Sequence, residues 1–464
     1  MQDLQIHGKQ RVTMPNISVV DFTYDDEIAR KRPQDRVENE AAKKKGLSAH
    51  LTLINFLKGM IGPGCFSLPL AFREAGLWSG FVLVFLIGLV TCICMSKIVR
   101  CSQFLAARQP KVETLNYAEM ADESFKQSFP VLRKHGHIAR RIVNLCLSSL
   151  VLGVCSIYYI FVVDHTIQVL NHVWPTLQLS KLTYLIIAIV PFTLLSYVRN
   201  VRVMSFVSLA GNIFMVLAII IIFWQLLPAP HLTRELPTYT NFRGLLLAAG
   251  AVMYSFEGQA LILPLENKMK YPVEMRGYTG VLSTGISLVT ICYAACGFFG
   301  YVTYGKNVRE SITLNMDDGI MNLSMKALMA LVVYTGYLLQ LYTLVESLKP
   351  SLLRFAQRKA IDTKKTAKIS DYVLRTVIVL LSFTIALLVP NLEDLIPLVG
   401  VTAGMMLALI IPATLDVTTY LPVYLAENRY KDIVLLLSNN AFFFLLGIFF
   451  VIAGLDANIR HLLK

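Results

Sequence analysis

The feature that most constrains the fold is a glycine- and proline-rich interruption inside the first long apolar segment. This segment starts near Leu51, and its residues 58–69 read KGMIGPGCFSLP, with three glycines and two prolines. A break at membrane depth exposes backbone N–H and C=O groups that lipid cannot satisfy, so it must face protein or a water-filled cavity. Broken spans of this kind indicate the midplane binding site of a transporter. The alternative is a glycine-lined face on which two membrane helices pack closely.

The composition of the chain indicates a polytopic membrane protein. Of 464 residues, 55% are hydrophobic and only 16% are charged, which is too apolar for a soluble domain of this size. A membrane helix needs roughly 20 apolar residues. Eleven segments meet this requirement: 51–71, 77–96, 142–170, 182–198, 203–227, 244–264, 278–303, 323–348, 372–390, 395–421 and 432–455. We therefore expect a disordered cytoplasmic tail at 1–50 and an all-α transmembrane domain at 51–464.

The positive charge of the chain is distributed as a membrane topology signal. The net charge is +13, and most of the 43 Lys and Arg residues lie in the tail and in every second connection after it. Cytoplasmic connections carry the excess of Lys and Arg. The N-terminus is thus predicted to be cytoplasmic and the C-terminus extracellular or luminal. The basic clusters then serve topology and contact with lipid headgroups of the bilayer, and we expect no nucleic-acid partner.

A second interruption falls in the sixth predicted span, where residues 254–259 read YSFEGQ. At 1.5 Å per residue, both interruptions lie near the middle of the bilayer, in spans that cross it in opposite directions. Two antiparallel broken helices five spans apart predict an inverted five-plus-five repeat with one additional helix. Glu257 lies in this break, and an acid at that depth is costly. It is either a proton-carrying or substrate-facing carboxylate, or a structural acid that accepts hydrogen bonds from free backbone N–H groups.

Other polar residues within the spans are weaker candidates for proton coupling. Asp164 and His165 lie near the outer end of the third span, where contact with solvent explains them equally well. Glu346 lies near the inner end of the eighth span, where contact with a cytoplasmic gate is the alternative. The eight cysteines have no zinc-type spacing, and no catalytic triad or phosphate loop lies near the breaks. We therefore expect neither an enzyme, nor a metal site, nor a cofactor other than a proton gradient.

Several motifs in order resemble the proton-coupled amino acid transporters of the amino acid/auxin permease group, within the amino acid–polyamine–organocation superfamily. These motifs are KGMIGPG at 58–64 followed by SLPLA at 67–71, FEG at 256–258 with LPLEN at 263–267, and SITLN at 311–315. The likeness covers about residues 50–455. It implies a leucine-transporter-like fold of eleven helices that moves small zwitterionic, neutral amino acids with protons by alternating access. It also implies a plasma-membrane or lysosomal location.

In the family that the chain resembles, amides at the first break hold the substrate carboxylate and carbonyls of the sixth span hold its amino group. The dipoles of the half-helices agree with this arrangement. Carried over to this sequence, the substrate-binding residues are Gly59, Gly62, Gly64, Tyr254, Ser255, Phe256 and Gly258. The proton-coupling candidates remain Glu257, Asp164 and Glu346.

Two positions depart from the family pattern. The family carries a histidine three residues before the lysine of the first break, where this chain has Asn55, which cannot titrate. It carries a threonine between two glycines, where this chain has Pro63, which lacks a backbone donor. Either Glu257 or another acid carries the proton, or transport is proton-independent facilitation or exchange. A third interpretation is an amino acid sensor that signals through the tail at 1–50.

Overall fold

The computed structural model describes residues 46–108, 114–176, 179–199, 201–317, 319–358 and 363–463. Most of the predicted tail at 1–50 therefore lies outside the described residues. Within the described ranges the chain forms helices and no strand, apart from one isolated β-bridge between Leu47 and Met269. This architecture confirms the prediction of an all-α polytopic membrane protein.

Every predicted apolar segment contains at least one helix. In chain order the helices are α2 (Ala49–Met60) with η1 (Pro63–Ser67) and α3 (Leu68–Ala75), α4 (Leu77–Arg108), α7 (Gly136–Val173), α8 (Lys181–Ser196), α9 (Val201–Leu226), α10 (Phe242–Ser255) with α11 (Gln259–Glu266), α12 (Val281–Tyr304), α14 (Ile320–Arg358), α15 (Thr363–Leu388), α16 (Leu392–Val399) with α17 (Ile411–Ala426), and α18 (Tyr430–Leu462). In the described part of the chain, nine helices are long and apolar enough to span a membrane, or ten if the bent pair α2 and α3 is one span. Helix α8 has 16 residues and is shorter than the nine. The count of eleven spans therefore stays a prediction.

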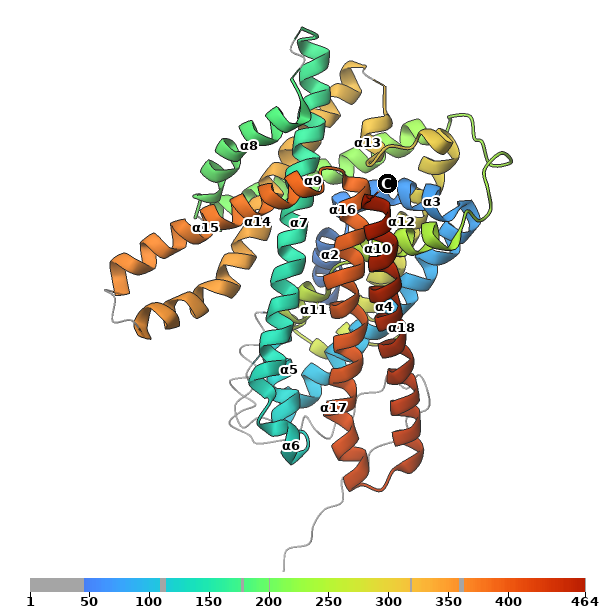
Figure 1. Ribbon diagram of the computed structural model, residues 1–464. Helices are drawn as coiled ribbons and strands as arrows, with labels where there is room; N and C mark the ends of the chain where they lie inside the picture. Colours follow the sequence, from blue (N-terminus) through green and yellow to red (C-terminus); the bar gives the residue numbers. More distant parts are fainter. Residues whose placement is uncertain are drawn as a thin grey trace, which may run out of the picture.

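Short helices mark the two ends of the molecule. Helices α5 (Tyr117–Lys126) and α6 (Pro130–Arg133) follow α4, and α13 (Ile312–Asn315) follows α12. Figure 1 shows α5 and α6 at one end and α13 toward the other, with α18 running between these ends to the C-terminus. The C-terminus thus lies near α3 and α16, away from α5 and α6. A contact of 2.7 Å between His461 Nδ1 and Asp394 Oδ1 joins the end of α18 to the start of α16.

The first predicted break is present between α2 and η1. Helix α2 ends at Met60, and the axis bends by 49° before the segment that begins at Pro63. Gly62 is extended at the bend, with φ −129° and ψ −170°. Pro63 has no N–H to donate, so a regular helix cannot continue through it, and the chain restarts as a 3₁₀ turn that leads into α3.

The second predicted break separates α10 from α11. Asn241 caps the start of α10 by accepting a hydrogen bond of 2.8 Å from the Gly244 N–H. The helix ends at Ser255, and α11 starts at Gln259. Two spans are therefore interrupted where the sequence predicts it, while the inverted repeat that would relate them remains a prediction.

The span formed by α16 and α17 departs from regular helix between them. Residues Gly400–Gly404 and Met406–Ile410 adopt π-helical turns. Pro412 explains part of this departure, because it cannot donate a hydrogen bond to the carbonyl of Ala408, four residues earlier. The sequence analysis did not predict these turns. The first of them packs against α10, and Gly400 lies directly on the carbonyl oxygen of Gly250.

We expect Gly400→Ala to destabilise the packing of α10 against this π-helical segment. The added Cβ would overlap the Gly250 carbonyl oxygen, a backbone atom that cannot rotate away. Overpacking of this kind costs about 1–3 kcal/mol, so the midpoint of thermal unfolding in detergent should fall. Gly404→Ala is the matched control, because its Cβ would lie 3.5 Å from the Val399 carbonyl oxygen, in ordinary contact. Equal midpoints for the two variants would contradict this packing.

Candidate functional site

The two helix breaks contact each other directly. The Gly64 carbonyl oxygen accepts hydrogen bonds from Ser255 Oγ at 3.0 Å and from Ser67 Oγ at 2.8 Å. A Cβ on Gly64 would lie 3.1 Å from the Tyr254 ring and 3.2 Å from Ser255 Cα, so a glycine permits this approach. The structure thus brings together Gly64, Tyr254 and Ser255, which the sequence places in different spans.

Two other predicted residues complete the contact between the breaks. Gly258 lies against Met60 Sδ, where a Cβ would overlap the sulfur atom. Phe256 is fully buried, and its ring packs edge-on against the ring of Tyr293 with centroids 5.0 Å apart. Gly258 and Phe256 therefore hold the end of α10 and the start of α11 close to the end of α2.

The remaining two predicted glycines have different surroundings. A Cβ on Gly62 would meet no atom within 4 Å, so open space adjoins the half-buried backbone at the first break. This space lies at the start of η1 and α3, where the helix dipole favours an anion. Gly59 lies inside α2 and faces Leu261 of α11. Its position indicates close helix packing more than contact with a ligand.

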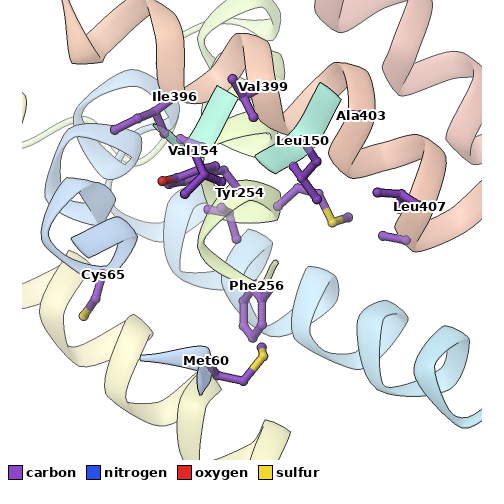
Figure 2. Packing of buried hydrophobic residues seen from close by; sticks show 14 of the residues in the cluster. Met60, Cys65, Leu150, Val154, Tyr254, Phe256, Ile396, Val399, Ala403 and Leu407 are labelled. Atoms are coloured by element: carbon purple, nitrogen blue, oxygen red, sulfur yellow. The ribbon is translucent and has the colours of Figure 1, made fainter. Parts of the chain in front are cut away.

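Apolar side chains surround the breaks. Figure 2 shows Met60, Tyr254 and Phe256 among residues of α7 and of the segment from α16 to α17. The residues contributed by these neighbouring helices are Leu150, Val154, Ile396, Val399, Ala403 and Leu407, all buried. The polar backbone at the breaks thus lies beside a packed apolar cluster to which several helices contribute.

The three proton-coupling candidates lie in different places. Glu257 lies within the second break, between the end of α10 and the start of α11. Asp164 of α7 instead pairs with Lys181 of α8, with Oδ1 2.7 Å from Nζ. Glu346 is exposed on α14. Only Glu257 therefore lies with the residues of the two breaks.

The residue after Asp164 belongs to a separate buried contact. His165 is fully buried in α7, and its Nε2 lies 2.7 Å from Thr313 Oγ1 of α13. This bond fixes α13 on the C-terminal part of α7. The structure therefore places Asp164 and His165 away from the breaks, at the end of the molecule that carries α13.

Sequence reasoning missed an ionic contact that joins α3 to α16. Arg73, near the end of α3, pairs with Glu393 of α16 and donates from Nη1 to the Val308 carbonyl oxygen at 2.9 Å. Glu310 accepts a hydrogen bond of 2.9 Å from the Leu392 N–H at the start of α16. These contacts join α3 and the segment that contains Val308 and Glu310 to the start of α16. A single sequence does not show which connections meet, so Arg73 carries no local signal of this contact.

The ionisation of Glu310 predicts a dependence of stability on pH. Burial, and then the negative charge of Asp164, raise its pKa from 4.5 to about 7. The folded protein therefore holds an additional proton between about pH 4.5 and 7, and the free energy of unfolding should fall as pH rises through this window. The total loss corresponds to about 3 kcal/mol at most.

The thermal midpoint at pH 5 and pH 8 checks this expectation. Glu310→Gln keeps an acceptor for the Leu392 N–H but cannot ionise, so its midpoint should fall less than that of the wild type between the two pH values. Glu235→Gln, at an exposed position in another connection, is the control. A wild-type slope that survives in Glu310→Gln would assign the effect to another group.

A second set of polar residues, three of them buried, joins α4, α17 and α18. Lys97 Nζ donates to Asn439 Oδ1 at 2.6 Å and to Asn440 Oδ1 at 2.7 Å. Asn440 Nδ2 donates to Asp416 Oδ2 at 2.8 Å, and Asp416 also pairs with Arg100. The signal that could have found this network is Asp416 itself, an acid inside a predicted span. Within the described ranges, no group of three His, Cys, Asp or Glu residues could hold a metal ion.

Comparisons with known proteins identify the family of this chain. The family model described as "Transmembrane amino acid transporter protein" matches residues 45–456. The chain is 29% identical over 414 residues to "Probable amino acid transporter skat-1" of Caenorhabditis elegans, covering 89% of each chain. It is 28% identical over 419 residues to "Proton-coupled amino acid transporter-like protein pathetic" of Drosophila melanogaster, covering 89% of this chain and 85% of the relative.

Proposed function

Because this chain belongs to the transmembrane amino acid transporter family, we propose that it carries small neutral amino acids together with protons across a membrane by alternating access. The observation that carries this proposal is the direct contact between two interrupted helices, with Ser255 Oγ on the Gly64 carbonyl oxygen. A family relative whose name describes it as proton-coupled supports the role of the proton. The chain is thus a transporter and not an enzyme in this proposal.

The substrate lies at the breaks in this proposal. Its carboxylate takes the open space beside Gly62 at the start of η1, where the helix dipole favours an anion, and Gly64 leaves room for it. Its amino group faces the carbonyls at the end of α10, near Ser255 and Phe256. Its side chain packs on the apolar residues of α7 and α16, which limits its size.

Glu257 carries the proton in this proposal, since it lies beside the substrate groups and Asn55 cannot titrate. The contact of Arg73 with Glu393 closes the outer side when the substrate is enclosed. Opening of the inner side requires α2 and α11 to move apart, and their break-forming residues supply the hinges. The cycle therefore needs no group other than the substrate, the proton and the chain itself.

The proposed orientation places α5, α6 and the N-terminus on the cytoplasmic side. Its support is the concentration of Lys and Arg in the connections at that end, together with the C-terminus at the opposite end of the molecule (Figure 1). The membrane is the plasma membrane or the lysosomal membrane, so the C-terminus is extracellular or luminal.

Uptake of radiolabelled glycine, alanine and proline into proteoliposomes, with and without an inward proton gradient, tests this function. Saturable uptake that the gradient drives above equilibrium is the expected result. Saturable uptake that is the same with and without the gradient would indicate facilitation or exchange instead of symport. Binding of an amino acid without uptake would favour the sensor that signals through its N-terminal tail.

A further inference from the structure

One tyrosine hydroxyl lies between the two breaks. Tyr293 of α12 is fully buried, and its hydroxyl oxygen is 2.7 Å from the Met60 carbonyl oxygen and 2.7 Å from the Ser255 carbonyl oxygen. Met60 is the last residue of α2 and Ser255 the last of α10. Both helices end at these residues, so no following helical turn supplies an N–H to either carbonyl. Helix α12 thus brings a side-chain donor to both of them.

A phenol has a single proton, so it cannot donate to both carbonyls at the same time. Whichever carbonyl receives the proton, the other faces a hydroxyl oxygen that offers it no hydrogen. A buried acceptor without a donor costs about 1–3 kcal/mol. The arrangement therefore needs one more N–H or O–H group than these three residues supply.

The surroundings indicate which kind of group fits. Met60 and Ser255 are both buried, and Met60 lies two residues before Gly62 and the open space beside it. Glu257 follows Ser255 by two residues and adds negative charge when ionised. A cationic donor with several N–H groups matches two carbonyl oxygens and a carboxylate better than a neutral hydroxyl does.

We propose that Tyr293 is a positioning residue of the transport cycle, whose one proton alternates between the Met60 and Ser255 carbonyls and leaves the other carbonyl for the amino group of the substrate. This inference rests on the proposed function. When the hydroxyl donates to Met60, it holds the end of α2 against α12 and leaves the Ser255 carbonyl to the substrate. When it donates to Ser255, the end of α2 is free to move. The hydroxyl thus links the presence of the amino group to the position of α2.

Tyr293→Phe tests the inference, because it keeps the ring packed on Phe256 and removes the donor. Both carbonyls then lack a partner in the empty protein, and a substrate ammonium group can satisfy both. Alanine should bind about tenfold more tightly than in the wild type, while its maximal uptake rate falls about tenfold because the bound state is over-stabilised. Propionate, which is alanine without the amino group, should bind as it does in the wild type.

Titration calorimetry in detergent and uptake in proteoliposomes measure these values. Tyr159→Phe is the matched control, since its buried hydroxyl donates to one carbonyl only, that of Leu185 at 2.6 Å. The ratio of propionate to alanine dissociation constants does not depend on the fraction of folded protein. If the wild type binds and transports alanine but Tyr293→Phe has the same ratio of dissociation constants, this inference is overturned and the proposed function stands. A wild type that neither binds nor transports small amino acids would overturn the proposed function and this inference with it.

Discussion

Glu257→Gln is expected to abolish the proton-driven accumulation of alanine while exchange of alanine across the membrane continues. The carboxyl lies in the second break, beside the proposed position of the substrate amino group. Glutamine keeps the size and the hydrogen-bonding oxygen but cannot bind or release a proton. Internal alanine should therefore rise only to the external concentration, whatever the proton gradient.

The measurement is the steady-state ratio of internal to external alanine in proteoliposomes with an acidic exterior. Glu346→Gln is the matched control, because it removes a carboxylate from an exposed position on α14. If accumulation persists in Glu257→Gln, another acid carries the proton, and Asp164 is the next candidate.

Gly62→Ala is expected to raise the KM for alanine by at least about tenfold, which corresponds to about 1.4 kcal/mol of lost binding, without a change in thermal stability. The reason is that its Cβ would enter empty space in the protein and meet no atom within 4 Å. The φ of −129° is one that alanine adopts without strain. The methyl group would thus compete only with whatever occupies that space during transport.

Uptake kinetics measure the loss of substrate binding, and thermal unfolding measures any loss of stability. Gly319→Ala is the control, since its Cβ would also meet no atom within 4 Å and it lies in the connection before α14. An unchanged KM in Gly62→Ala would place the substrate carboxylate elsewhere, and a lowered unfolding midpoint would show that the space is not open.

The sequence predicted the breaks well because each residue type involved has a local reason to end a membrane helix. Pro63 lacks a donor, and a carboxylate such as Glu257 rarely lies at membrane depth without a function. Hydrophobic runs of sufficient length likewise located the helices. These signals depend on neighbours in the chain and need no knowledge of the tertiary contacts.

The contacts between spans could not be predicted in the same way. Tyr293, Asp416 and Arg73 act through partners more than 20 residues away, and a single sequence does not show which helices are neighbours. Asp416 was visible as an acid in a span, but its pairing with Arg100 depends on the packing of α17 against α4. Tyr293 gave no signal, because a tyrosine inside an apolar run is ordinary.

The most direct test of the central claim, proton-coupled amino acid transport at the two breaks, is simultaneous measurement of alanine and proton entry into the same proteoliposomes. A pH-sensitive dye in the lumen records protons while labelled alanine is added outside, with no initial pH difference. We predict that alanine acidifies the lumen, with the same half-saturating concentration as alanine uptake, and that Glu257→Gln loses the proton signal. Alanine entry without any acidification in the wild type would contradict proton coupling.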